Sequence, residues 1–442
     1  MIHVHDAATP QLHRSTRLDL PAATILAAVA LAAFLLAPRA APFEFLLLAA
    51  VPIAALARGG DGVGALARSP LLAACAAFGL YIAINAAWSV DPAEAYGKVL
   101  FYWVLLVAAV LAITGLGDVS DAVLTRLQKA AIVAVTAGAV FLLIEVLTDQ
   151  AIRRFIFSML PFARPPPKHI KIVDGDVVGI GAYVLNRNMA ALSLVLWPVL
   201  LMLRTLLDGR RALAAGVALL ATSLVAVLNS EHETSMLAVI AACVAFAGMW
   251  VAAPVMRKAI AAGWVIATLL VVPLASVAYR QELHFADWLP QTARNRVILW
   301  GYTASEVTKN PLLGVGVAST KDLDEANAEK AVQPPGYTYP LRTGRHSHNI
   351  FMQTWYELGA IGAVLLLAIG LCTIAVLSRL PRADQALAFA SFVAAVLIGS
   401  FSWGIWQTWF LAAYGIWAVL LAVACEGSRR QARQTGIVTL RT

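Results

Sequence analysis

Charged side chains are scarce in this 442-residue chain, and their scarcity argues against a soluble fold. They make up 13% of the sequence, hydrophobic residues make up 60%, and the mean hydropathy is +0.77. A typical soluble domain is about one-quarter charged. Apolar runs long enough to cross a bilayer recur along the whole sequence. The composition therefore predicts an all-α polytopic transmembrane bundle.

Cysteine and the common catalytic motifs are also scarce or absent. Cys75, Cys243, Cys372 and Cys425 all lie in apolar runs without CxxC spacing, so they are interpreted as small core residues. The sequence has no P-loop, no HExxH, no GxSxG and no GxGxxG opening a helix after a strand. An ATP-driven or nicotinamide mechanism has no visible site, and we expect no cofactor.

About twelve apolar segments are predicted to span the membrane, in a single integral membrane domain over residues 1–442. Their approximate bounds are 21–37, 41–57, 70–88, 99–115, 128–147, 189–207, 212–229, 234–252, 258–278, 349–378, 386–402 and 405–424. With the N-terminus inside, every predicted cytoplasmic segment holds at least two basic residues: Arg14, Arg17; Arg58, Arg68; Arg126, Lys129; Arg204, Arg210, Arg211; Arg257, Lys258; Arg379, Arg382; and Arg429, Arg430, Arg433, Arg441. The short outer loops hold only Arg39 and Lys98. The positive-inside rule therefore predicts that both termini are cytoplasmic. The net charge of +8 is interpreted as this topology signal and not as a sign of nucleic acid binding.

Two long polar segments, 148–188 and 279–348, fall on the outer side, and both are basic. Long loops are translocated whatever their charge, so these cations either have no role or hold an anionic ligand. Pro165, Pro166 and Pro167 predict an excursion over the surface in the first segment. The second is predicted to be a large periplasmic loop with short helices.

One such helix is predicted after Thr292, as its cap, and before Asn310 and Pro311, which end it. Arg296 and Trp300 would share one face of this helix.

The stretch from Arg342 to Gly362 closes the second polar segment and opens a new apolar run. His348 stands at the start of the expected helix. Gly359 and Gly362 fall on roughly the same face of that helix as His348. The two glycines would form a small-residue notch that another helix or a lipid chain could enter.

A neutral histidine can accept a proton from a hydroxyl, and arginines can hold a diphosphate leaving group. A histidine with several arginines therefore suits displacement at a carbon that carries a lipid-linked diphosphate. A metal at His346 and His348 is disfavoured, because no further Cys or His lies nearby in the sequence. Glu145, inside a predicted span, is a functional candidate because a buried carboxylate is costly, although it could also reach water.

Several of these residues together resemble a known family. His348-Asn349, nine residues and then Gly359-x-x-Gly362 resembles the signature of the O-antigen ligase family, in the O-antigen ligase/polymerase superfamily. Arg296-x-x-x-Trp300, the run from Asn310 to Gly316, Asn186-Arg187-Asn188 and Glu357 look like further parts of the same domain. The turn Ser230-Glu231-His232-Glu233 departs from the family pattern, because an arginine seen there in relatives is missing.

The resemblance implies an enzyme at the periplasmic face of the Gram-negative inner membrane. Such enzymes transfer a glycan from undecaprenyl diphosphate to the lipid A–core oligosaccharide in lipopolysaccharide biosynthesis, without metal or ATP. His348 would be the base or activator of an inverting displacement, and His346 would support it. The expected diphosphate contacts are Arg187 and Arg296, with Arg294, Arg342, Arg345 and Lys98 as further candidates. Asn349, Glu357, Gly359, Gly362 and Trp300 are expected to be structural.

Three alternatives remain open at this stage. An O-antigen polymerase, or another lipid-linked oligosaccharide transferase, would share the motif and differ in its acceptor. Relatives that glycosylate protein usually continue into a longer soluble part than the few residues around Arg441. A transporter or flippase would place charges at mid-membrane in broken helices, whereas the apolar segments here are almost free of charge.

The charge pattern predicts which parts of the chain an impermeant thiol reagent can reach. A cysteine placed near Lys321 should be modified from outside the cell, and a cysteine near Arg430 should be modified only after permeabilisation. The opposite labelling pattern would invert the predicted topology.

Overall fold

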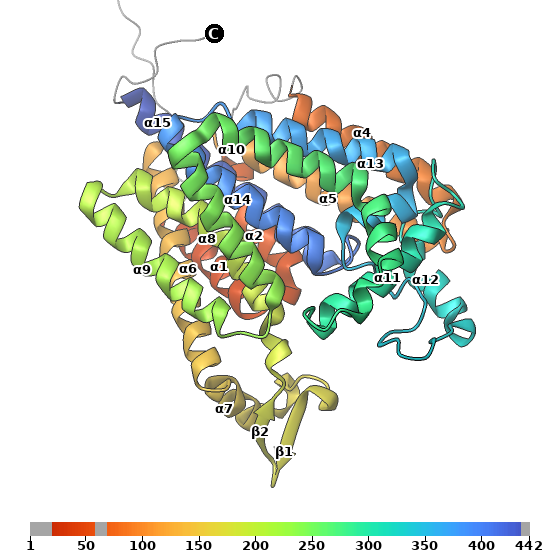
Figure 1. Cartoon of the computed structure of the whole chain (residues 1–442). Helices are drawn as coiled ribbons and strands as arrows, with labels where there is room; N and C mark the ends of the chain where they lie inside the picture. Colours follow the sequence, from red (N-terminus) through yellow and green to blue (C-terminus); the bar gives the residue numbers. More distant parts are fainter. Residues whose placement is uncertain (1–19, 58–68, 435–442) are drawn as a thin grey trace, which may run out of the picture.

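The computed structural model of the chain describes residues 20–57 and 69–434, and within them most of the chain is helical. The long helices pack side by side in one bundle (Figure 1). These helices are α1 Leu20–Leu36, α2 Ala41–Leu56, α4 Pro70–Asn85, α5 Pro92–Gly115, α6 Asp121–Leu147, α8 Asn186–Leu206, α9 Gly209–Leu228, α10 Glu233–Arg280, α13 Ile350–Leu377, α14 Arg382–Phe401 and α15 Thr408–Gln434. Shorter elements lie between them: α7 Ala151–Met159, the strands β1 Ile170–Val173 and β2 Asp176–Ile180, α11 Gln291–Val307 and α12 Ser319–Ala326.

Ten of the described helices are long and apolar enough to cross a membrane. Two predicted spans are absent from that count for clear reasons. The apolar part of α1, Thr24–Leu36, is short, and α10 is two helices merged across a kink at the non-helical Ala252. Ten helices, α1 and the second arm of α10 correspond to the twelve predicted spans, so the all-α polytopic bundle is confirmed.

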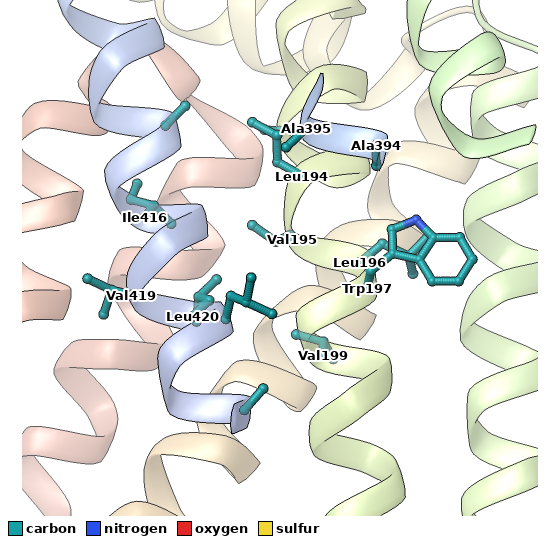
Figure 2. Close-up of a cluster of buried hydrophobic side chains, with 14 of the residues drawn as sticks. Leu194, Val195, Leu196, Trp197, Val199, Ala394, Ala395, Ile416, Val419 and Leu420 are labelled. Carbon is teal, nitrogen blue, oxygen red and sulfur yellow. The ribbon is translucent and has the colours of Figure 1, made fainter. Parts of the chain in front are cut away.

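The centre of the bundle is α8, which is buried along most of its length. Leu194 and Val195 lie among side chains of α14 and α15 (Figure 2). Trp197 points the other way and packs against Phe246 of α10, with ring centroids 6.1 Å apart. Ala394 and Ala395 of α14 are small, so that helix can approach α8 closely. The first turn of α8 is thereby fixed relative to the last turn of α14, and both carry residues of the site described below.

Polar caps extend two spans beyond their apolar residues. The Asp91 carboxylate accepts from the amides of Ala93 and Glu94, each at 3.0 Å, and α5 begins at Pro92 instead of near 99. Ser120 caps α6 in the same way, so that helix begins at Asp121 instead of near 128. Hydropathy locates the apolar part of a helix, and the capping residue sets where the helix begins.

The segment 148–188 is more ordered than the predicted loop. It forms α7 and then an antiparallel hairpin in which Ile170 pairs with Ile180 and Val173 with Asp176. Glu145 is fully buried and does not reach water. Its Oε1 accepts from the amides of Ile152 at 3.0 Å and Arg153 at 3.3 Å, and its Oε2 lies 3.3 Å from Arg153 Nε. Glu145 therefore caps α7, and this structural role accounts for its burial.

The segment 279–348 contains α11, as predicted, but Thr292 does not cap it. The helix begins at Gln291 after Pro290, and Thr292 Oγ1 donates to Glu233 Oε2 at 2.6 Å. Thr292 therefore ties α11 to the start of α10, and α11 ends at Val307 before Asn310 and Pro311.

The predicted small-residue notch is wrong, because the loop from Pro311 to Gly316 fills it. Gly359 interrupts α13 with φ +62° and ψ −162°. The amides of Val315 and Gly316 donate to the carbonyls of Tyr356 and Glu357, each at 3.0 Å. The amide of Ala360 donates to Pro311 O at 2.9 Å. The loop thus satisfies the backbone groups that the break in the helix exposes.

At Gly362 the space beside the Cα is taken by the side chain of Leu358, one turn earlier in the same helix. Neither glycine is open to another helix or to a lipid chain.

Contacts at the helix ends agree with the predicted sidedness of the spans. Arg430, at the end of α15, donates to the Leu116 and Val119 carbonyls between α5 and α6. Asn188, at the start of α8, donates to the Leu35 carbonyl at the end of α1, at 2.6 Å. Which side faces the cytoplasm stays a prediction. Five of the basic residues on which that prediction rests lie outside the described residues: Arg14, Arg17, Arg58, Arg68 and Arg441.

Replacing Gly359 with alanine should destabilise the protein. A Cβ there would meet the Leu312 carbonyl, and the backbone lies in a region open almost only to glycine, which alone costs about 1–3 kcal/mol. Gly97→Ala is the matched control, because a Cβ at Gly97 meets nothing within 4 Å and alanine favours a helix. Thermal unfolding in detergent should show a large loss for Gly359→Ala and no loss for Gly97→Ala. Equal unfolding temperatures would contradict the interlock of the loop with α13.

Candidate functional site

The turn between α14 and α15 brings together three segments that are far apart in sequence. The Phe401 carbonyl accepts from Arg296 Nη2 of α11 at 3.0 Å and from Thr234 Oγ1 of α10 at 3.1 Å. The next carbonyl, that of Ser402, accepts from His348 Nδ1 at 2.5 Å. Arg296 and His348, which the sequence analysis selected separately, are therefore held on adjacent carbonyls of one turn.

The hydrogen bond to Ser402 fixes the tautomer of His348. A carbonyl only accepts, so Nδ1 carries the proton and Nε2 keeps its lone pair. Nε2 has no hydrogen-bond partner among the described residues. Burial lowers the pKa of His348 from its ordinary value, the Ser402 carbonyl partly opposes this, and the Arg296 charge adds to it. The imidazole is therefore a neutral base with one free nitrogen.

His348 has φ +52°, an unusual conformation for a residue other than glycine. Immediately after it, the Asn349 side chain caps α13 by accepting from the amides of Phe351 at 2.9 Å and Met352 at 3.0 Å. The cap and the Ser402 bond together hold the strained residue in place.

His346 lies beside His348, with ring centroids 4.1 Å apart. Its Nε2 is buried without a hydrogen-bond partner among the described residues. Burial, then the neighbouring His348 and then the charges of Arg345 and Arg187, lower the pKa of His346 to about 3. Both imidazoles are therefore neutral near pH 7.

Arg187, in the first turn of α8, reaches the tryptophans that follow Ser402 in the same connection. Its guanidinium lies 5.8 Å from the centre of the Trp403 ring and 5.4 Å from that of Trp409. Its Nε is buried without a hydrogen-bond partner, and no carboxylate pairs with it among the described residues. Two tryptophans stabilise this cation without neutralising it.

The other predicted diphosphate contacts differ from Arg187 and Arg296, because each has a carboxylate partner. Arg342 binds Asp324 through two nitrogens, Arg345 lies 3.1 Å from Glu325, Arg294 lies 3.4 Å from Asp287, and Lys98 lies 3.2 Å from Glu94. Arg296, in contrast, forms no ion pair within 4.0 Å in the described chain, although the Glu233 charge partly offsets the lowering of its pKa by burial. The structure thus distinguishes two uncompensated arginines from four compensated cations.

The residues predicted to be structural support the segments that carry the site. Trp300 Nε1 donates to Ser347 O at 2.6 Å, and its ring lies 5.9 Å from that of Phe401. The fully buried Glu357 accepts from Ala318 N, Thr320 N, Thr320 Oγ1, Gln353 Nε2 and Trp406 Nε1. These bonds join the loop after α11, the first part of α13 and the turn before α15.

The sequence pointed to no role for the aromatic residues of the turn or for His232, which packs behind them. Trp403 contacts Arg187 and also stacks with the ring of His232, where the centroids are 5.3 Å apart. His232 Nδ1 lies 2.6 Å from Ser235 Oγ, and burial lowers the pKa of His232 to about 3. The available signal was the run SWGIWQTW at the junction of the predicted spans 386–402 and 405–424, since three tryptophans so close together around a glycine are unusual.

An apolar cavity of about 600 Å³ opens beside this site. Side chains of both arms of α10 and of α14, among them Trp264, Ala267, Val271, Phe392 and Val396, line it. Trp300, Asn349 and Phe401 also line it, and each either bonds to a site segment or adjoins a site residue in sequence. The cavity can take an apolar chain whose polar end lies at the histidines and arginines.

The described chain contains one cluster of three acidic groups that could reach a common ion. This cluster lies apart from the turn between α14 and α15. It consists of Asp91, Glu94 and Asp322. Asp91 caps α5 and Glu94 pairs with Lys98, so these carboxylates already have partners. His346 and His348 are not part of it.

The fold and the site define a polytopic helical membrane protein with a free imidazole nitrogen and two uncompensated arginines around one inter-helix turn. The family model described as O-Antigen ligase matches residues 217–367, which include His232, Arg296, His348 and both motif glycines. The resemblance to the O-antigen ligase family that the sequence suggested is thus confirmed over this part of the chain.

Two similar curated proteins are Rickettsia proteins named "Putative polysaccharide ligase". The one from Rickettsia felis is 28% identical over 243 residues, which are 54% of this chain and 58% of that protein. The one from Rickettsia conorii is 28% identical over 241 residues, which are 54% of this chain and 57% of that protein. The chain thus spans somewhat more than half the length of these relatives.

The surroundings of His348 predict an acid-shifted titration. Imidazole resonances of isotope-labelled histidine, assigned with a His348→Gln variant, should show half-protonation below the ordinary 6.5, because burial and the Arg296 charge disfavour the cation. Arg296→Gln should move that midpoint upward, and Arg345→Gln, which removes a cation not found to act on His348, should move it less. A midpoint at or above 6.5 in the unaltered protein would contradict the assigned tautomer and burial.

Proposed function

We propose that this protein is an O-antigen ligase that transfers a glycan from undecaprenyl diphosphate to the lipid A–core oligosaccharide at the periplasmic face of the inner membrane. The single observation that carries the proposal is the turn at Phe401–Trp403, where a free base nitrogen and two arginines without acidic partners converge. The family match over residues 217–367 and the ligase names of the Rickettsia relatives support it.

The donor diphosphate would bind at Arg187 and Arg296. An arginine already paired with a carboxylate must break that pair to take a phosphate, whereas these two are free to form charge-assisted, bidentate bonds. Arg187 also lies in the first turn of α8, where the helix dipole favours an anion. The first isoprene units of the donor chain fit the apolar cavity, whose rim adjoins Arg296 and His348.

In the reaction, the acceptor hydroxyl oxygen forms a bond to the anomeric carbon of the donor glycan. The hydroxyl proton passes to Nε2 of His348, and the bond from the anomeric carbon to the diphosphate oxygen breaks. The electron pair stays with undecaprenyl diphosphate, whose charge the two arginines stabilise. Attack opposite the leaving group inverts the anomeric centre. His346 stays neutral and keeps a second positive charge away from His348. This scheme assigns no role to a metal or a nucleotide.

An O-antigen polymerase would use the same base and the same arginines, with a second lipid-linked glycan as acceptor. Reconstitution separates the two functions. Purified protein in nanodiscs is supplied with the lipid-linked donor and either lipid A–core or a second lipid-linked glycan. Transfer to lipid A–core supports the ligase, and chain growth on the carrier lipid without transfer to lipid A–core would establish the polymerase instead.

His348→Ala should slow turnover by about two to four orders of magnitude, the usual contribution of one general base. Donor binding should persist, because the diphosphate contacts are assigned to arginines. Single-turnover transfer and donor binding on purified variants measure the two effects separately. Near-normal turnover in His348→Ala would remove histidine from the role of base.

Arg187→Ala and Arg296→Ala should weaken donor binding as well as turnover. Lysine at either position should restore only part of the loss, because a point charge does not reproduce the guanidinium fork. Arg345→Ala is the control, since that arginine already has a carboxylate partner. Binding losses in Arg345→Ala equal to those in Arg296→Ala would show that uncompensated charge is not what selects the donor contacts.

A further inference from the structure

The segment between α6 and α8 exposes the densest run of large apolar side chains outside the candidate spans of the described chain. Phe155 is 64% exposed, Met159 62% and Phe162 87%, and Ile156 and Leu160 between them are also exposed. The proposed transfer reaction uses none of them. Side chains of this size are not left in water without a reason.

The opposite side of α7 is already occupied. Arg154 Nη1 donates to Val178 O at 3.1 Å, and Ser158 Oγ accepts from Val177 N at 2.8 Å, so this side is fastened to strand β2. At 100° per residue, Phe155, Ile156 and Met159 lie on the other side of the helix. The helix is therefore amphipathic, with its polar side packed on the hairpin and its apolar side uncovered.

The position of α7 is fixed at the end of a span. It begins four residues after α6 ends at Leu147, and Glu145 inside α6 caps its first amides. Arg153 Nη2 also donates to Leu36 O at the end of α1, at 3.3 Å. Figure 1 shows α7 and the hairpin at the lower end of α6, away from α11 and α12. Helix α7 therefore lies where α1 and α6 leave the bilayer.

The charge of the segment indicates what covers it. Residues 151–173 contain five cations and no carboxylate: Arg153, Arg154, Arg164, Lys168 and Lys171. Lys168 and Lys171 have no ion-pair partner among the described residues. A short helix with an aromatic and aliphatic face, flanked by lysine and arginine, is the pattern of helices that lie in the interface of an anionic bilayer.

We propose that α7 and the 3-10 turn after it, Pro161–Ala163, form an interfacial anchor whose apolar face inserts between anionic phospholipid headgroups. Arg153, Arg154 and Arg164 are bound within the protein, so Lys168 and Lys171 are the cations that contact headgroup phosphates. The anchor leads through the hairpin directly into α8, since Gln150 Nε2 donates to Ile180 O at 3.1 Å and α8 begins at Asn186. It thus also fixes the depth at which the first turn of α8, with Arg187, meets the lipid surface.

The test places a fluorophore on the anchor in the full-length protein. In a variant whose four cysteines are replaced by alanine, Phe155→Cys, Phe162→Cys and, as control, the exposed Glu329→Cys are each labelled with an environment-sensitive dye. Nanodiscs contain phosphatidylcholine with or without phosphatidylglycerol, plus lipids that carry a quencher at defined depths. The dye at positions 155 and 162 should emit at shorter wavelength than at 329 and should report a depth of about 5–10 Å below the headgroup surface.

The contribution of charge is tested in the same discs. Lys168→Gln combined with Lys171→Gln should shift the emission at position 162 towards that in water when phosphatidylglycerol is present, whereas Lys330→Gln should not. Emission at 155 and 162 matching that at 329 would overturn the anchor, because no other protein is present to compete for the face. Insertion that ignores both lysines and phosphatidylglycerol would overturn its anionic specificity. None of these readouts depends on transfer activity.

Discussion

One buried carboxylate, Glu357, joins the segments on which the site is built. It accepts hydrogen bonds from the loop after α11, from Gln353 and from Trp406. A carboxylate taken out of water is costly unless every oxygen is satisfied, and five donors satisfy this one. Removing it would leave those donors unpaired in the interior, so its hydrogen bonds add to the backbone bonds that hold the three segments together. The break in α13 at Gly359 follows directly, since the loop that fills the break is the loop that Glu357 binds.

The hydrogen bonds of Glu357 also determine the geometry of the polar site. Gln353 donates to Glu357 and accepts from the Ile405 amide at 3.1 Å, which fixes the turn before α15. The carbonyls of Phe401 and Ser402, in the same connection, orient Arg296 and His348. A carboxylate in their place would neutralise the arginine and would favour the charged imidazole. Backbone carbonyls orient both groups and do neither. The same atoms therefore position both groups and leave their chemistry available.

The class of fold could be predicted from the sequence, because hydropathy depends on neighbouring residues. The sequence also singled out His348 and Arg296, which the structure holds on adjacent carbonyls. The Arg-Trp face of α11 also followed from helical spacing, and both its members contact Phe401. The loop threaded through α13 could not be predicted, since helical periodicity assumes an unbroken helix and Gly359 interrupts it. Nor could the roles of Trp403 and Trp409, which depend on the packing of α14 and α15 against α8. The spacing of charges in the sequence likewise gave no way to rank the outer cations, because their carboxylate partners lie in other segments.

Among the described residues Arg187 differs from the paired cations in having no carboxylate partner, and this difference has a physical consequence. A buried guanidinium without a carboxylate loses hydration that no counter-charge restores. Trp403 and Trp409 return part of that loss through their ring faces, yet they contribute no negative charge. The full positive charge thus acts on the neighbouring His346, in surroundings that screen it less than water would. An arginine bound to aspartate, as Arg342 is, contributes almost no net field at that position. The two tryptophans therefore do more than pack: they keep a cation stable without an ion pair, and the proposed diphosphate would supply the missing charge.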